Sequence, residues 1–258
     1  TTAYCANNET STEAFWHVLV VDLNFDETTA QCSGALGVAC ASRGSSLLPY
    51  RNLGTAIGEA MRTGADLLLL SDLDTPVSIP AGLALHGTGS SLVAQYYPQY
   101  YSGNTGSAIT ALSGSLSVVS AGGSGVGSTP TVLSGLRLST GITLDGDFGS
   151  AGVWFAETVI ETPIVATRVT GSVVVTRSHV TSSDLFINSD GAWMPSSNAT
   201  MTVSADCNLF EGLGGSLVLF TTGNRESRVY TNVHDNYFDA SSTVSFVIVN
   251  TAQAQTRF

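Results

Sequence analysis

Two pairs of aspartates have a spacing that acid/base or metal chemistry could use. Asp145 and Asp147 lie two residues apart in "LDGDFG", and Asp72 and Asp74 have the same spacing in "SDLDTP". Residues i and i+2 of a strand point to the same side, so each pair would bring two carboxylates together. Such a pair could act as general acid and base or contribute to a calcium site, although calcium needs more oxygens than two carboxylates supply. Asp and Gly are also common in turns for backbone reasons alone, which is the simpler interpretation of "LDGDFG".

The segment "VHDNYFD" places His234 beside Asp235, with Asp239 four residues further on. A histidine next to a carboxylate could serve acid/base catalysis. The stronger interpretation is structural, because Asp235-Asn236 fits a corner between strands, where stacked asparagines satisfy backbone groups.

The remaining patterns do not favour an enzyme. No G-x-S-x-G segment is present to mark a nucleophilic serine. His17, His86 and His179 are interpreted as isolated polar residues near strands whose hydrogen bonds are satisfied. We therefore assign no catalytic, cofactor-binding or metal residue and expect no cofactor. The residues to test for catalysis are Asp145, Asp147, His234 and Asp235.

Charge excludes several partners. All nine basic residues are arginine, against twenty acids, which gives a formal net charge of −11 and a pI near 4.5. Such a chain repels phosphate backbones, so we expect no nucleic-acid partner. No apolar stretch reaches the roughly 18–20 residues of a membrane span, and the absence of lysine removes Schiff-base and P-loop chemistry.

The cysteines and sequons favour an extracellular setting. Cys32 and Cys40 frame the Gly-rich loop "CSGALGVAC" and are predicted to form a disulfide, with buried free thiols as the alternative. The pairing of Cys5 and Cys207 stays open, and the cysteine spacing does not fit zinc. Asn8 and Asn198 lie in N-x-T sequons and are predicted glycosylation sites. The absence of an initial methionine suggests that an upstream segment, such as a signal peptide, has been removed.

Four tyrosines surround a proline in "QYYPQYY", a segment interpreted as a loop that leaves the body of the fold. Tyrosine is enriched at contact surfaces because it buries area and keeps a polar tip. Tyr96, Tyr97, Tyr100 and Tyr101 are therefore predicted interface residues, which would bind a sugar or another subunit. A loop packed on itself is the alternative.

One helix must position the first part of the chain. In "YRNLGTAIGEAMRTG", Asn52 is a plausible N-cap and Gly64 ends the helix. Leu53, Ile57, Ala60 and Met61 are expected to share its apolar face.

After Ala65 the pattern predicts only short strands, separated by Gly, Ser, Asn, Asp or Pro. A weak repeat aligns Val180, Phe210 and Phe238, and another aligns Leu138, Val159 and Val180. Repeats of this length suit the coils of a solenoid, with a β-sandwich as the other possibility.

The order of four segments resembles the pectin-lyase-like right-handed parallel β-helix superfamily. The segments are "WHVLVVD", "CSGALGVAC", "NLGTAIGEAMRTGADLLLL" and "VSIPAGLALHGTG". The resemblance covers residues 15–90 and is generic beyond them. It implies an all-β, right-handed parallel β-helix of one domain (1–258), with an N-terminal strand, Cys loop and capping helix in 1–64 and coils in 65–258. It also implies a secreted or surface location, but no particular activity.

The leading functional hypothesis is a structural subunit of an extracellular or cell-surface filament, coat or adhesive appendage. The final segment "STVSFVIVNTAQAQTRF" has no obvious polar cap, which predicts end-to-end or strand-addition contacts and thus a homo-oligomer. A polysaccharide-degrading or glycan-binding protein is the alternative. A fragment of a longer autotransporter-like passenger is a third possibility.

Overall fold

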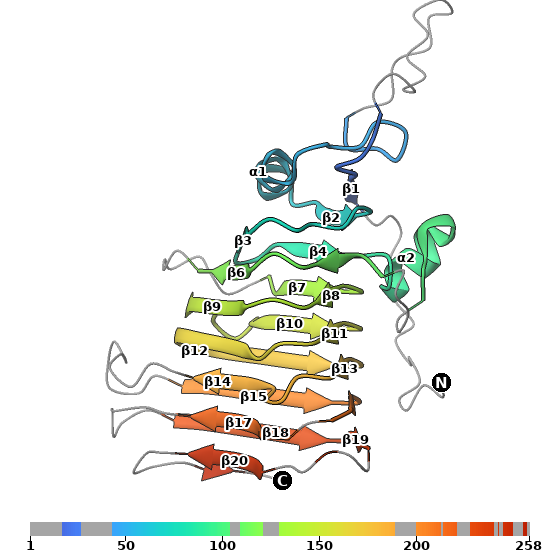
Figure 1. The fold of residues 1–258 in the computed structure, drawn as a ribbon. Helices are drawn as coiled ribbons and strands as arrows, with labels where there is room; N and C mark the ends of the chain where they lie inside the picture. Colours follow the sequence, from blue (N-terminus) through green and yellow to red (C-terminus); the bar gives the residue numbers. More distant parts are fainter. Residues whose placement is uncertain are drawn as a thin grey trace, which may run out of the picture.

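The structure is a computed structural model. It describes residues 17–26, 43–103, 109–120, 129–188, 200–212, 214–220, 228–239, 242, 245–249 and 255–256. Its strands are short, parallel to their hydrogen-bonded neighbours, and arranged in a curled sheet of the solenoid type (Figure 1). The prediction of a mostly β protein with parallel strands is therefore confirmed.

The strands lie on three faces. We call them the α2 face, after the short helix α2 (Ser91–Tyr96) that packs beside it, the short face and the β9 face. The α2 face contains β1 (Val18–Val21), β2 (Asp66–Leu69), β4 (Ala84–His86), β7 (Thr131–Ser134), β10 (Val153–Ala156), the second half of β12 (Ile164–Thr176), β15 (Thr200–Asp206), β18 (Arg228–His234) and β21 (Gln255–Thr256). The short face contains β5 (Ala111–Leu112), β8 (Arg137–Leu138), β11 (Val159–Ile160), β13 (His179–Val180), β16 (Leu209–Phe210) and β19 (Tyr237–Phe238). The β9 face contains β3 (Val77–Pro80), β6 (Leu116–Val119), β9 (Ile142–Asp147), the first half of β12, β14 (Phe186–Asn188), β17 (Ser216–Phe220) and β20 (Ser245–Val249).

Alternation along each strand decides which side chains enter the core. In β15 the residues alternate between buried and partly exposed, and Met201, Val203 and Ala205 point inward. Strands of neighbouring coils pair in register, so Val173 lies beside both Val153 and Val203. The inward apolar side chains consequently form one continuous core that runs along the stack.

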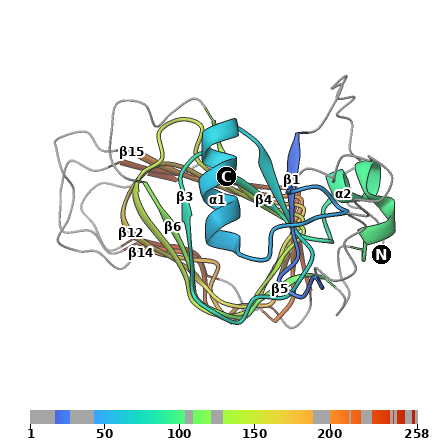
Figure 2. The same cartoon turned by 90° about the horizontal axis from the view of Figure 1, so that it is seen from above.

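The helix α1 (Leu53–Thr63) lies across the first coil (Figure 2). Asn52 caps it by accepting a hydrogen bond from the Thr55 amide, and Gly64 ends it in the left-handed conformation, both as predicted. Its buried residues are Leu53, Ala56 and Ala60, all part of the core. The prediction that Met61 shares the buried face is wrong, because Met61 is 49% exposed.

Two further sequence predictions need correction. The tyrosine segment 95–101 is not a plain loop, because it begins in the short helix α2 (Ser91–Tyr96) and continues through the 3-10 turn η2 (Pro98–Tyr100). The alignment of Val180, Phe210 and Phe238 is confirmed by strand pairing. The alignment of Leu138 with Val159 is wrong by one residue, since Leu138 pairs with Ile160.

Candidate functional site

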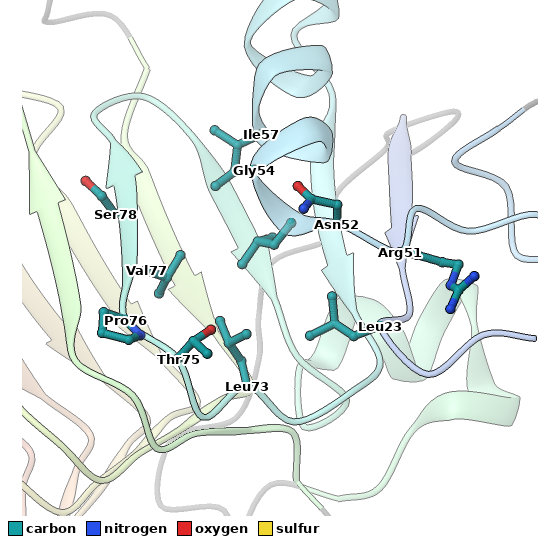
Figure 3. A pocket seen from close by; sticks show the side chains of 11 residues that line it. Leu23, Arg51, Asn52, Gly54, Ile57, Leu73, Thr75, Pro76, Val77 and Ser78 are labelled. Atoms are coloured by element: carbon teal, nitrogen blue, oxygen red, sulfur yellow. The ribbon is translucent and has the colours of Figure 1, made fainter.

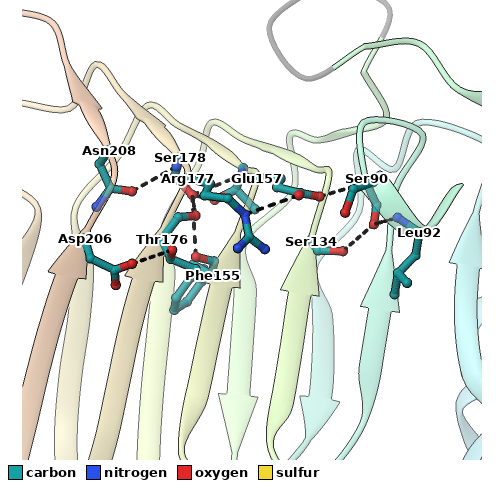
Figure 4. A network of polar contacts seen from close by, with 12 residues as sticks. Ser90, Leu92, Ser134, Phe155, Glu157, Thr176, Arg177, Ser178, Asp206 and Asn208 are labelled. Carbon is teal, nitrogen blue, oxygen red and sulfur yellow. Dashed lines mark hydrogen bonds and ion pairs between the residues drawn. The ribbon is translucent and has the colours of Figure 1, made fainter. Parts of the chain in front are cut away.

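A polar network lies where each coil turns from the α2 face to the short face (Figure 4). We call this turn the corner. In five successive coils the corner residue has a positive φ, at Gly135 (59°), Glu157 (56°), Arg177 (48°), Cys207 (56°) and Asp235 (55°). Non-glycine residues rarely adopt this conformation. A repeated left-handed residue therefore turns the chain at each coil.

After four of these corners the next residue is polar, and its side chain hydrogen-bonds to neighbouring coils of the stack. Asn208 is 1% exposed, and its Oδ1 accepts a hydrogen bond from the Ser178 amide at 2.9 Å. Its Nδ2 donates to the Val175 carbonyl at 2.9 Å and to Asn236 Oδ1 at 3.0 Å. The structural interpretation of Asn236 is thus confirmed, because this side chain also donates to the Ala205 carbonyl at 2.8 Å.

The helix α2 lies on the outer side of the corner at Glu157. Glu157 is buried, and its Oε2 accepts a hydrogen bond from the Ser91 amide at 2.6 Å. Its Oε1 lies 3.4 Å from Nε of Arg177. The carboxylate therefore ties the first amide of α2 to a coil further along the stack.

Beneath α2 lies a series of hydrogen bonds that was not predicted from the sequence. Nδ1 of His86 lies 2.6 Å from Ser134 Oγ, which lies 3.0 Å from Ser90 Oγ. Nε2 of His86 lies 3.3 Å from Asp66 Oδ2. The residue types are those of a Ser-His-Asp triad, but Ser134 is only 4% exposed and His86 only 2%. Both side chains are therefore shielded from solvent, and their hydrogen bonds hold Ser90, the N-cap of α2.

Replacing Glu157 with alanine is expected to loosen α2 selectively. A buried, charge-assisted hydrogen bond contributes about 1.5–3 kcal/mol, so amide hydrogen exchange of α2 should accelerate by roughly 10- to 100-fold. The matched control is Glu161→Ala, whose carboxylate accepts from Nε of Arg137 at 2.9 Å at the surface and raises the pKa of that guanidinium. An exposed pair contributes less than about 1 kcal/mol. Equal acceleration of α2 exchange in both variants would contradict this role for Glu157.

The residues proposed for catalysis do not form one site. Asp145 and Asp147 lie on the β9 face, where Asp147 accepts hydrogen bonds from the Gly149 amide at 3.0 Å and Thr170 Oγ1 at 2.7 Å. His234 is the last residue of β18 on the α2 face, several coils further along the stack, and Asp235 follows it at the corner. His234 Nδ1 lies 3.0 Å from Asp235 Oδ2. Both of these side chains are largely exposed. The two pairs consequently cannot act on one substrate group.

The other acidic candidates support the backbone. Asp72 Oδ1 accepts a hydrogen bond from the Ala111 amide at 2.7 Å, and Asp239 forms a backbone bond with Phe210 at 3.0 Å. Asp74 is exposed. Among the described residues, no three His, Cys, Asp or Glu side chains gather in a way that could hold a metal.

The four tyrosines differ in their surroundings. Tyr97 and Tyr100 stack with ring centroids 6.4 Å apart and pack on a small cluster formed by Val20, Leu68 and Val93. Burial raises the pKa of the Tyr97 phenol, and the neighbouring Tyr100 adds to this shift. Tyr101 is 40% exposed. The segment is therefore partly self-packed over β1 and β2, and its proposed role as an interface stays a prediction.

A pocket of about 420 Å³ lies between the start of α1 and the turn before β3 (Figure 3). Its lining is mainly apolar and includes Leu23, Ile57, Leu73 and Val77. Among the described residues that line it, Arg51 is the one charged residue, and these residues do not include the paired acid and base that hydrolysis or elimination would use.

Several sequence predictions fall outside the described residues, namely the Cys32–Cys40 disulfide and glycosylation at Asn8 and Asn198. Cys207 is disulfide-bonded at its corner.

Taken together, the fold and its corners define a mostly β protein of parallel strands in a curled, solenoid-type sheet. Comparisons with protein-family models, curated proteins and solved structures found no match. In the described part of the chain, no helix is long and apolar enough to cross a membrane.

Proposed function

We propose that this chain is a structural subunit of an extracellular or cell-surface assembly, folded as a closed right-handed parallel β-helix and joined to a second copy at its last coil. The cysteines and sequons favour the extracellular setting. The polysaccharide-degrading alternative has less support, since Asp145 and Asp147 lie on a different face from His234 and Asp235.

One observation carries the self-association. Among the described residues, β19, β20 and β21 each have a hydrogen-bonded neighbour strand on one side only. Edge strands present backbone donors and acceptors that can pair with another chain. The half-buried Val233 packs against the core from the same last coil, so apolar contact can accompany the pairing.

The two ends of the stack differ, which restricts how copies can meet. Because α1 lies over the first coil, the last coil of one copy cannot stack directly on the first coil of another. Two copies can still meet through their last coils, an arrangement that closes on itself. The proposal therefore favours a closed dimer over the filament that the sequence suggested.

Light scattering over a wide protein concentration range tests this proposal, with negative-stain electron microscopy of the same sample. We expect twice the monomer mass and no filaments. Val233→Glu should weaken association at least tenfold, because it places a charge among inward-facing apolar groups of the last coil. The matched control is Asn232→Glu, which adds the same charge at the exposed neighbouring position and should associate normally. A wild-type protein that stays monomeric at high concentration would refute the proposal.

A further inference from the structure

The outer side of the α2 face carries an exposed tryptophan. Trp154 of β10 is 40% exposed, although its strand neighbours Val153 and Phe155 are fully buried. Its indole Nε1 donates a hydrogen bond to the Ala151 carbonyl at 2.9 Å. The ring is thus held in one orientation with its polar atom already satisfied. The exposed remainder of the ring offers an apolar surface.

Strand pairing determines which side chains surround this ring. Trp154 lies between Val132 of β7 and Val174 of β12, and Ser204 of β15 continues this row. The flanking outward positions carry Ser172 and Thr202 on one side, and Thr176 and Asp206 on the other. We call the surface formed by Trp154, Ser172, Val174, Thr202, Ser204 and Asp206 the Trp154 shelf.

The shelf is polar, acidic and periodic. It has hydroxyls and one carboxylate but no cation, and Asp206 is oriented by a hydrogen bond from Thr176 Oγ1 at 2.8 Å. Arg177, at the adjacent corner, faces Glu157 at 3.4 Å. The rows repeat at the spacing of parallel strands, about 4.8 Å. A polymer lying along the shelf would therefore meet the aromatic ring on the coil of β10 and polar groups on the coils of β12 and β15.

We propose that the Trp154 shelf binds an uncharged polysaccharide. A fixed aromatic face suits the apolar side of a sugar ring, and hydroxyl and carboxylate groups beside it suit the sugar hydroxyls. The carboxylate and the chain's net charge of −11 disfavour anionic polymers such as polygalacturonate. A preoriented ring also reduces the ordering cost of binding. This inference is independent of the proposed dimer, because it rests on the outward side of central coils.

Affinity electrophoresis in native gels tests the proposal with two neutral probes, hydroxyethyl cellulose and galactomannan, and with polygalacturonate as the anionic probe. We expect retardation by at least one neutral polymer and none by polygalacturonate. Trp154→Ala should weaken neutral binding at least tenfold, because exposed aromatic anchors dominate such contacts. Asp206→Asn should weaken it a few-fold. The control is Met61→Ala, which removes a similarly exposed apolar side chain from α1 and should bind like wild type.

Circular dichroism of each variant distinguishes lost binding from lost folding, and Asp206→Asn provides a second, nearly isosteric test. Three results would overturn the inference: no binding to either neutral polymer, binding to polygalacturonate alone, or unchanged neutral binding by a folded Trp154→Ala protein. Because the readout is binding and not molecular mass, failure here leaves the test of the dimer unaffected.

Discussion

Gly135→Ala is expected to lower the free energy of unfolding by about 2–5 kcal/mol, as measured by urea denaturation followed by circular dichroism. Gly135 turns the corner with a φ of +59°, where a side chain is strained. An added Cβ would also lie 1.9 Å from the Ser90 amide nitrogen and 2.5 Å from the Gly89 carbonyl carbon. These are backbone atoms at the start of α2, so relief requires α2 or the corner to move.

Gly64→Ala provides the matched control. Gly64 ends α1 with a φ of +70°, but an added Cβ would meet no atom within 4 Å. This variant has the backbone strain without the steric clash, so the free energy of unfolding is expected to fall by about 1–2 kcal/mol. Equal losses in the two variants would show that the close approach of Gly135 to Ser90 contributes nothing to stability.

The second large effect is expected at Asn208. Asn208→Ala removes the hydrogen bonds to the Ser178 amide, the Val175 carbonyl and Asn236 Oδ1. Ser178 is itself buried, so its amide would be left without this acceptor inside the stack. A buried unsatisfied polar group costs about 1–3 kcal/mol, and the cavity left by the side chain adds to that cost. Urea denaturation should therefore show a loss of about 2–4 kcal/mol.

Asn232→Ala is the control for Asn208, because it removes the same side chain from an exposed position on the α2 face. Surface substitutions of this kind usually change stability by less than about 0.5 kcal/mol. If Asn208→Ala lowered the free energy of unfolding no more than Asn232→Ala, the stacked asparagines would contribute nothing to stability. The coils would then be held together by the apolar core alone.

Features with a local signal were predicted well. The ends of α1 follow from Asn52 and Gly64, whose capping depends only on residues within one turn. The corner at Asp235-Asn236 and the alignment of Phe210 with Phe238 were also predicted correctly from the sequence. The rings of these two phenylalanines stack 4.8 Å apart in the core. The helix ends and the corner depend on a few neighbouring residues, whereas Phe210 and Phe238 were aligned because a short pattern recurs one coil later.

Features that depend on distant residues were missed. The helix α2 has no strong pattern of its own and is held by Glu157, which lies 66 residues from Ser91. The bonds of His86 likewise join three strands, with Ser134 lying 48 residues away. Val159 was misaligned by one residue because two adjacent apolar residues, Val159 and Ile160, fit the repeat equally well until strand pairing selects Ile160.

Alternating short strands, turn residues and a capped helix were enough to predict a mainly β protein, since these preferences act between near neighbours. Its parallel arrangement was predicted from weak repeats and from the family resemblance. Which outward side chains are buried under α2 and which, like Trp154, face solvent was decided only in three dimensions. Both kinds occupy the same outward side of one face, as His86 and Trp154 do. The difference between them arises because α2 packs over one end of that face, a contact that no local pattern encodes.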